Sequence, residues 1–358
     1  MRPRSWAALG AALVVGGLLG GVIVAETSPP ASGVTSGSAA VSACDVTSVA
    51  NKVIPSVVTI SARGPDGGGT GSGEVIRPDG YILTNNHVIS IAAGGGSVEV
   101  QFPDGRTAPA TITGRDPQTD LAVIKVATSR QLNPIPMGSS SSLKVGQADV
   151  VIGAPLGLSG TVTSGIISAL DRNIQVPGEN GSSALLVSAI QTDASINPGN
   201  SGGAMVNCAG RLVGIPSAGA TVPDSSGESS GGSIGLGFAI PADLAKSISA
   251  EIIATGKVTH AFLGVQTLPI PSVAASQAGV PDGLYVEAVT PGSPAARAGL
   301  RPGDVITKIN NQPATSHDQL QALTLTKKPG DTVVLEYRPG PGSHPVERTL
   351  TLSPAPTR

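Results

Sequence analysis

The scarcity of histidine narrows the search for acid–base chemistry in this chain. The 358-residue sequence contains four histidines, and His87 alone lies between residues 57 and 240. An imidazole titrates near neutral pH and can therefore take a proton from a nucleophile under physiological conditions. An imidazole base in this region must be His87, although a single histidine at the end of a strand is more often structural.

A serine in a glycine-rich segment is the candidate nucleophile. Ser201 lies in the sequence Gly-Asn-Ser-Gly-Gly at 199–203. A serine hydroxyl attacks a carbonyl effectively only when a base removes its proton. The glycines allow a sharp turn, in which the backbone N–H groups of Gly199 and Ser201 would face the oxyanion that forms on attack. The alternative is an ordinary glycine-rich turn.

The third candidate is a carboxylate that would orient the imidazole. Asp120 follows the turn at 116–119 and opens the apolar run 121–126. A turn aspartate without a catalytic role is the alternative, because aspartate is common in turns. The chain order His87, Asp120, Ser201 matches the order in chymotrypsin and differs from that in subtilisin and the α/β-hydrolases.

Short apolar runs must supply the elements that position these residues. The chain has 48 glycines, 30 prolines and only 2% aromatic residues, which suits a β-rich protein with many turns. Such runs, with no amphipathic helices between them, indicate a sandwich or a barrel. We expect strands within 57–60, 80–88, 97–102, 121–126, 149–155, 163–170, 185–192 and 211–215, and mobile loops at 177–183 and 223–233.

A helix is expected at each end of this region, and a second, smaller region follows. We predict a short helix at 46–53 and a connecting helix at 241–256, in which Pro241 suits the first turn and Gly256 the end. The connecting helix has an apolar face made of Leu244, Ile248 and Ile252. The region at 257–358 should contain strands near 284–289, 304–309 and 332–337 and a helix at 316–326.

The N-terminal residues indicate export. Arg2 and Arg4 precede an uncharged run at 6–25, which is about as long as a bilayer-spanning helix. Basic residues before the run place the N-terminus inside and the rest of the chain outside. Residues 1–26 fit either a transmembrane anchor, with the rest held at the outer face of the cell membrane, or a cleaved signal segment, with the rest secreted. The stretch at 27–43 has the composition of a flexible spacer.

The two cysteines allow the prediction of export to be tested. Cys44 and Cys208 are too few for a disulfide scaffold and lack metal-ligand spacing. In an exported protein they are expected to form one disulfide. The alternative is two separate thiols, with Cys208 buried.

Charge and motifs exclude other classes of function. The net charge is −2 and no basic stripe is present, which argues against nucleic-acid binding. The sequence contains neither a phosphate-binding loop nor a credible metal-ligand cluster, so we expect no cofactor and no metal.

Five stretches carry a family resemblance: GTGSGEVI (69–76), ILTNNHVI (82–89), TDLAVIKV (119–126), QTDASINPGNSGGAMVN (191–207) and GLGFAIP (235–241). They resemble the protease domain of the HtrA/DegP family of chymotrypsin-like serine proteases. The resemblance implies a mainly β protein, with a protease domain and its connecting helix over 44–256, a double six-stranded β-barrel in that domain and the site between the barrels. It implies the triad His87–Asp120–Ser201, with Gly199 and Ser201 at the oxyanion hole.

The same resemblance suggests which residues select the substrate. The position six before the nucleophile often floors the first specificity pocket in chymotrypsin-like enzymes, and here it is Ser195, followed by Ile196. Without a carboxylate there, cleavage after Lys or Arg is disfavoured. We expect cleavage after small aliphatic residues, with Leu236 and Phe238 helping to wall the pocket.

Residues 257–358 resemble a PDZ domain of the HtrA kind. The matching stretches are AFLGV (261–265) and the segment at 283–314. Leu263, Gly264 and Val265 would form a loop that captures the C-terminal carboxylate of a peptide, which adds a strand to the sheet edge. The alternative is a turn with core residues.

These expectations describe an ATP-independent endopeptidase that acts on unfolded or misfolded proteins outside the cytoplasm. A peptide-binding chaperone or scaffold and a signalling protease with one membrane partner are the alternatives. The family resemblance suggests a homotrimer, but the usual aromatic contacts near the N-terminus have no clear match in a chain with three Phe and three Tyr.

Overall fold

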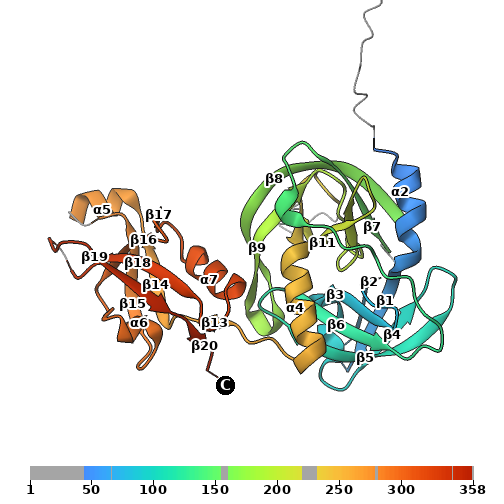
Figure 1. Cartoon of the computed structure of the whole chain (residues 1–358), viewed down its shortest axis with the longest axis horizontal. Helices are drawn as coiled ribbons and strands as arrows, with labels where there is room; N and C mark the ends of the chain where they lie inside the picture. The colour runs from blue at the N-terminus through green and yellow to red at the C-terminus, as the bar shows by residue number, and fades with distance from the viewer. Residues whose placement is uncertain are drawn as a thin grey trace, which may run out of the picture. The chain divides into compact units, whose positions relative to one another are not determined.

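Two closed antiparallel β-barrels follow one another along the chain (Figure 1). The computed structural model describes residues 44–65, 67–154, 160–219, 232–278, 281–340 and 342–356. The strand order is β1-β2-β3-β6-β5-β4 in the first barrel and β10-β11-β12-β9-β8-β7 in the second. The predicted double barrel is therefore present.

The strands cover the predicted apolar runs and several segments that the apolar pattern does not predict. The glycine-rich β2 and the polar β5 are examples. The first barrel contains β1 (Val57–Gly64), β2 (Gly67–Val75), β3 (Tyr81–Asn85), β4 (Ser97–Gln101), β5 (Thr107–Asp116) and β6 (Leu121–Val126). The second contains β7 (Ala148–Gly153), β8 (Thr161–Pro177), β9 (Ser183–Thr192), β10 (Ala204–Asn207), β11 (Leu212–Gly219) and β12 (Gly237–Pro241).

Alternate side chains of the central strands enter different cores. On β6, Ile124 faces the interior of the first barrel, whereas Val123 joins a core shared by both barrels. On β7, Val151 faces the interior of the second barrel, whereas Ile152 joins the shared core. Both faces of these strands are buried, which explains why their sequences are almost continuously apolar. Full burial of each such side chain stabilises the fold by about 1.5–3 kcal/mol.

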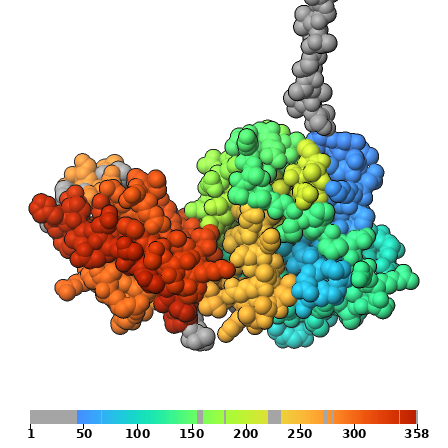
Figure 2. Space-filling view, in the orientation of Figure 1, coloured from blue at the N-terminus to red at the C-terminus, as the bar shows by residue number. Residues whose placement is uncertain are grey.

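Two helices cover the shared core, as predicted. α2 (Val46–Val53) and α4 (Ala242–Thr255) bury apolar side chains in it, among them Val49, Val53, Ile248 and Ile252. Figure 2 shows α4 in gold at the surface, between the green second barrel and the blue-green first barrel. Two details differ from the prediction: Pro241 is the N-cap residue of α4, and Leu244 is only partly buried at the rim of the core.

The chain beyond α4 forms a smaller sheet around a separate core. The sheet has the order β14-β15-β16-β18-β19, β17 pairs with β16, and β13 pairs with β20. The predicted strands and helix of this region correspond to β15, β16, β18 and α7. The elements are β13 (Ala261–Phe262), β14 (Val265–Ile270), α5 (Ser272–Ala278), β15 (Gly283–Val289), α6 (Pro294–Arg297), β16 (Val305–Ile309), β17 (Gln312–Pro313), α7 (His317–Thr326), β18 (Thr332–Arg338), β19 (Val346–Thr351) and β20 (Ser353–Pro354).

The predictions for the N-terminal residues and for one loop fall outside the described residues. These are the anchor or signal segment at 1–26, the spacer at 27–43 and most of the loop at 223–233. Among the helices that the structure describes, none is both long enough and apolar enough to cross a bilayer.

The predicted disulfide between Cys44 and Cys208 is present. The two Cα atoms are 5.2 Å apart and 164 positions apart in the sequence. The bond ties the residue that precedes the cap of α2 to the turn between β10 and β11. Cys208 lies in an exposed turn and is not buried, in contrast to the two-thiol alternative.

Replacing both cysteines by serine should lower the free energy of unfolding by about 2–4 kcal/mol, because a long loop is no longer closed in the unfolded chain. Urea denaturation with and without a reductant provides the measurement. The reductant should bring the wild type to the stability of the double variant and leave the variant unchanged. Free thiols in the exported wild-type protein would contradict the assignment.

Candidate active site

His87 and Asp120 form a closely bonded pair on the first barrel. His87 was expected where a strand gives way to a loop, but it lies on the one-turn helix α3 (Asn86–Ile89) directly after β3. Its Nδ1 is 2.8 Å from Asp120 Oδ2 and 3.0 Å from Oδ1, and its backbone N–H donates to Oδ1 at 2.9 Å. Because an ionised carboxylate only accepts hydrogen bonds, Nδ1 carries the ring hydrogen and Nε2 is left with its lone pair.

Two asparagines hold the backbone of Asp120. Asp120 has a φ of +58°, in the left-handed region that aspartate adopts more readily than most residues. Its carbonyl accepts hydrogen bonds from Asn85 Nδ2 at 2.8 Å and from the backbone N–H of Asn86 at 3.1 Å. The asparagines before His87 therefore fix the backbone from which the carboxylate of Asp120 reaches the imidazole.

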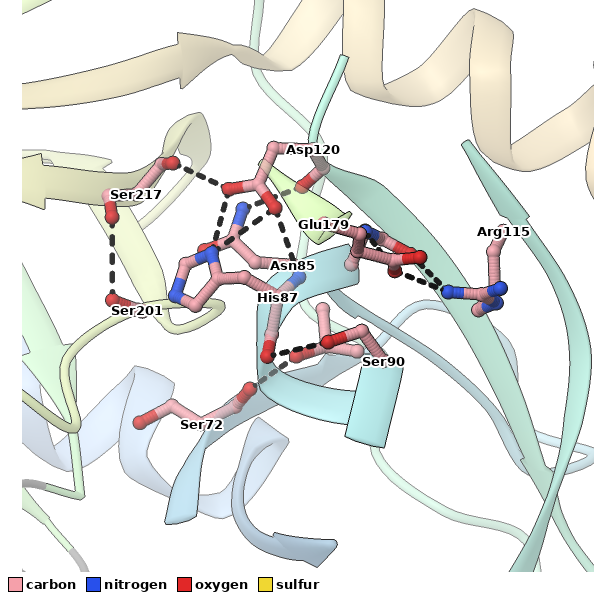
Figure 3. Close-up of polar contacts among 11 residues, drawn as sticks. Ser72, Asn85, His87, Ser90, Arg115, Asp120, Glu179, Ser201 and Ser217 are labelled. Carbon is pink, nitrogen blue, oxygen red and sulfur yellow. Dashed lines mark hydrogen bonds and ion pairs between the residues drawn. The ribbon is translucent and has the colours of Figure 1, made fainter. Parts of the chain in front are cut away.

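Ser217 connects this pair to the second barrel, and the sequence analysis missed it. Its hydroxyl donates to Asp120 Oδ2 at 2.6 Å, and its carbonyl accepts the hydroxyl of Ser201 at 3.3 Å (Figure 3). A bulge between Pro216 and Ala218 on β11 places Ser217 there, and such bulges re-aim side chains. No local motif marks this serine, because its role depends on how β11 lies against the first barrel.

Burial and Asp120 act in opposite directions on the pKa of His87. Burial of the ring lowers this pKa because it disfavours the charged imidazolium. The hydrogen bond that His87 donates to Asp120, together with the negative charge of Asp120, raises the pKa, and the net pKa lies above the ordinary value of 6.5. His87 is therefore a stronger base than an exposed histidine.

A tight turn precedes Ser201. The N–H of Asn200 donates to the carbonyl of Asn197 at 2.9 Å, with Pro198 and Gly199 between them. Gly199 has a φ of +100°, which a turn with proline at its second position and glycine at its third requires. The sequence Asn-Pro-Gly-Asn thus specifies the backbone on which the candidate nucleophile stands.

His87 and Ser201 line one cavity of about 390 Å³, together with Ile196 and Gly199. Figure 3 shows the ring of His87 between Asp120 and Ser201. The structure therefore brings the three candidate catalytic residues and the candidate oxyanion donors to one place.

The four candidate pocket residues are not all together. Ile196 lines the cavity of Ser201, whereas Ser195 is exposed and contributes its carbonyl to bonds with neighbouring side chains. Leu236 is 39% exposed and lies outside the described lining. Phe238 lines a neighbouring cavity of about 470 Å³ beside His87 and Asp120.

Ile196 contributes an apolar side chain to the wall of the cavity that contains Ser201. Its side chain is buried, and a Cβ placed on Gly237 of β12 would lie only 2.6 Å from Ile196 Cδ1. The isoleucine therefore packs directly against the backbone of β12. The described lining contains no Asp or Glu that would pair with a basic substrate side chain.

A polar cluster ties the β8–β9 connection to the helix of His87. Glu179, in a 3₁₀ turn at Glu179–Gly181, accepts from Asn86 Nδ2 at 2.8 Å and pairs with Arg115 of β5. Arg115 also donates to Asn86 Oδ1 at 3.0 Å (Figure 3). The loop at 177–183, for which mobility was predicted, is thus bonded to the first barrel.

The candidate carboxylate-binding loop lies at the start of β14. Leu263 is buried, and Gly264 has a φ of +81° with no room for a Cβ beside Ser293. β14 is the outer strand of its sheet, and a groove separates its first residues from α7. The described lining of this groove includes Leu263, Gly264, Val265, Leu320, Gln321 and Thr324.

Within the described ranges, no three or more His, Cys, Asp and Glu side chains gather closely enough to hold a metal ion.

Comparisons with known proteins agree with this geometry. Residues 71–215 match the family model of the trypsin-like peptidase domain, and residues 285–339 match the model of the PDZ domain. The chain is 46% identical over 340 residues to the serine protease PepD of Mycobacterium tuberculosis, which covers 92% of this chain and 70% of PepD. It is 40% identical over 283 residues to the periplasmic serine endoprotease DegP of Escherichia coli, which covers 76% of this chain and 56% of DegP.

Solved structures give the same result. The HtrA-type protease AlgW with a decapeptide superimposes with a TM-score of 0.68 at 33% identity, over 87% of this chain and 99% of AlgW. The two matched domains, the relatives and the solved structures all indicate the same family. The chain belongs to the HtrA family of serine proteases.

Proposed function

We propose that the chain is an ATP-independent endopeptidase that cleaves unfolded or misfolded proteins outside the cytoplasm. The observation that carries this proposal is the pairing of His87 with Asp120 at the wall of the cavity that contains Ser201. The serine protease relatives support the reaction class.

The proposed reaction follows from the bonded atoms. Rotation of the Ser201 side chain away from the carbonyl of Ser217 would bring its hydroxyl to Nε2 of His87, which accepts the proton as Ser201 attacks a peptide carbonyl. Asp120 then stabilises the imidazolium, and the N–H groups of Gly199 and Ser201 bind the oxyanion. His87 returns the proton to the leaving amine, and water hydrolyses the acyl-enzyme in the reverse sequence of steps.

We also propose cleavage after small aliphatic residues. Ile196 lines the cavity with an apolar side chain that packs against β12, and the described lining has no carboxylate, so we expect a Val or Ala side chain to be accepted better than a charged one. Phe238 would contact the substrate in the neighbouring cavity. The exposed Ser195 and Leu236 have weaker support as pocket residues.

Two observations support an extracytoplasmic location. A structural disulfide persists in oxidising compartments, and Cys44–Cys208 is such a bond. The relatives DegP and DegQ are named periplasmic. Anchoring through residues 6–25 and assembly as a trimer remain predictions.

The C-terminal domain is proposed to bind the C-termini of peptides. The outer position of β14 allows a peptide to add a strand, and the groove beside α7 offers apolar side chains for its last residue.

Ser201→Ala should reduce casein hydrolysis at least about 10³-fold, because the nucleophile is lost while folding is retained. The rate of release of labelled fragments is the measurement. Ser164→Ala, which removes an exposed hydroxyl on β8, is the matched control and should keep the wild-type rate. Undiminished cleavage by the Ser201 variant would disprove the assignment of the nucleophile.

The pH dependence should report the pKa of His87. Only the neutral imidazole accepts a proton, so kcat/KM should rise with pH through a pKa above 6.5. Asp120→Asn removes the charge that raises this pKa while burial still lowers it. We expect kcat/KM to fall about 10³–10⁴-fold and its acid limb to move to lower pH. A profile from pH 5 to 9 with a peptide substrate tests this; an unmoved acid limb in the variant would assign the titration to another group.

The Ser201→Ala protein also allows the peptide groove to be tested without cleavage. A peptide with an apolar last residue and a free carboxylate should bind at least about tenfold more tightly than its C-terminal amide, because N–H groups of the loop at 263–265 would meet the negative charge. Fluorescence anisotropy measures both affinities. Equal affinities would show that the terminus is not recognised.

A further inference from the structure

Ser72 of the first barrel contacts both ends of the segment that carries the proposed nucleophile. Its backbone N–H donates to the carbonyl of Ser201 at 2.9 Å, and its hydroxyl donates to the carbonyl of Gly199 at 2.6 Å. The same hydroxyl accepts the N–H of Ala154, at the end of β7, at 2.8 Å. Ser72 is completely buried, so these bonds do not compete with solvent.

The orientation of Ser72 is itself fixed. Thr84 Oγ1 donates to the carbonyl of Ser72 at 2.6 Å. A Cβ on Gly202 would lie 2.4 Å from the Ser72 carbonyl oxygen, and a Cβ on Gly203 would lie 3.2 Å from Ser72 Cβ. The second and third glycines of Gly-Asn-Ser-Gly-Gly therefore allow the nucleophile turn to approach Ser72 this closely.

These bonds constrain the two N–H groups proposed to bind the oxyanion. The donors belong to Gly199 and Ser201, at the two ends of a three-residue segment. Each peptide unit is planar, so a hydrogen bond to a carbonyl also fixes the plane of the unit to which it belongs. Ser72 fixes the units Gly199–Asn200 and Ser201–Gly202, which flank the unit Asn200–Ser201 that carries the N–H of Ser201. The N–H of Gly203 donates to the carbonyl of Asn200 at 3.0 Å and fixes this middle unit. The N–H of Gly199 lies in the unit directly before the first one that Ser72 fixes. A turn with several glycines would otherwise rotate readily.

We propose that Ser72 is a positioning residue for the oxyanion hole, acting through the carbonyls of Gly199 and Ser201 without touching the substrate. This proposal rests on the proposed peptidase function. Ser72 and the oxyanion turn lie on different barrels. The first barrel would therefore contribute the base, His87, and would also align the oxyanion hole through Ser72.

Ser72→Ala removes the hydroxyl and keeps the backbone N–H. We expect kcat for a peptide substrate to fall about 10- to 100-fold, less than the 10²–10³-fold typical of deleting an oxyanion donor itself. KM should change less than about twofold, and the acid limb of the pH profile should not move, because His87 and Asp120 are unaffected.

A tetrahedral adduct separates alignment of the hole from general damage. A peptidyl boronic acid forms such an adduct with the serine and should lose affinity by about the same factor as kcat/KM. The cleaved product peptide, which makes no adduct, should keep its affinity. Ser249→Ala is the matched control: its buried hydroxyl donates to the carbonyl of Lys246 in α4, at 3.2 Å, and its loss should change neither affinity.

Several outcomes would overturn the proposal. One is a kcat of Ser72→Ala within twofold of the wild type; another is a parallel loss of boronate affinity, product affinity and unfolding free energy, which indicates a purely structural role. Thr84→Val removes the hydrogen bond to the Ser72 carbonyl. This variant should lower kcat by a smaller factor than Ser72→Ala and should likewise leave KM unchanged. It decides the question if Ser72→Ala does not fold, and an unchanged kcat then refutes the proposal. An inactive wild type would instead refute the peptidase function itself.

Discussion

The contact between the two barrels is the constraint on which the site depends. His87 and Asp120 belong to the first barrel and Ser201 to the second, so their geometry exists only when the barrels are held in one arrangement. The shared core, covered by α2 and α4, supplies most of the attraction. Burial of aliphatic surface is not directional, however, and does not by itself fix a relative orientation to a fraction of an ångström.

Direction comes from polar bonds, buried or partly buried, that cross from one barrel to the other. Ser217 donates to Asp120, Glu179 pairs with Asn86 and Arg115, and Ser72 bonds the turn of the nucleophile. Each bond has a narrow range of favourable distances and angles, and most lie where water does not compete. The apolar core thus stabilises the assembly, while these bonds select the arrangement in which the proposed base, carboxylate and nucleophile meet.

The same division explains which residues the sequence could reveal. His87, Asp120 and Ser201 are marked by residue type, chain order and local motif. Ser217 and Glu179 carry no comparable mark, because each acts on a residue distant in sequence and near only after folding. Ser195 illustrates the reverse case: its position six residues before Ser201 suggested a pocket, but its side chain is exposed, because side-chain direction depends on backbone geometry that position does not specify. Leu236, suggested as a pocket wall, is 39% exposed.

From the sequence alone, the double barrel and the candidate catalytic residues could be predicted. Apolar runs set the strands, the segment Asn-Pro-Gly-Asn set the turn before Ser201, and the two cysteines indicated the disulfide that is present. Other features depend on contacts that exist only in the folded chain. The tertiary structure placed glycine-rich β2 as a full barrel strand, where apolar alternation is missing because Gly71 and Gly73 leave room for neighbouring side chains. It also put His87 on a helical turn and Ser72 against the nucleophile, because contacts between distant segments exist only once both barrels have closed.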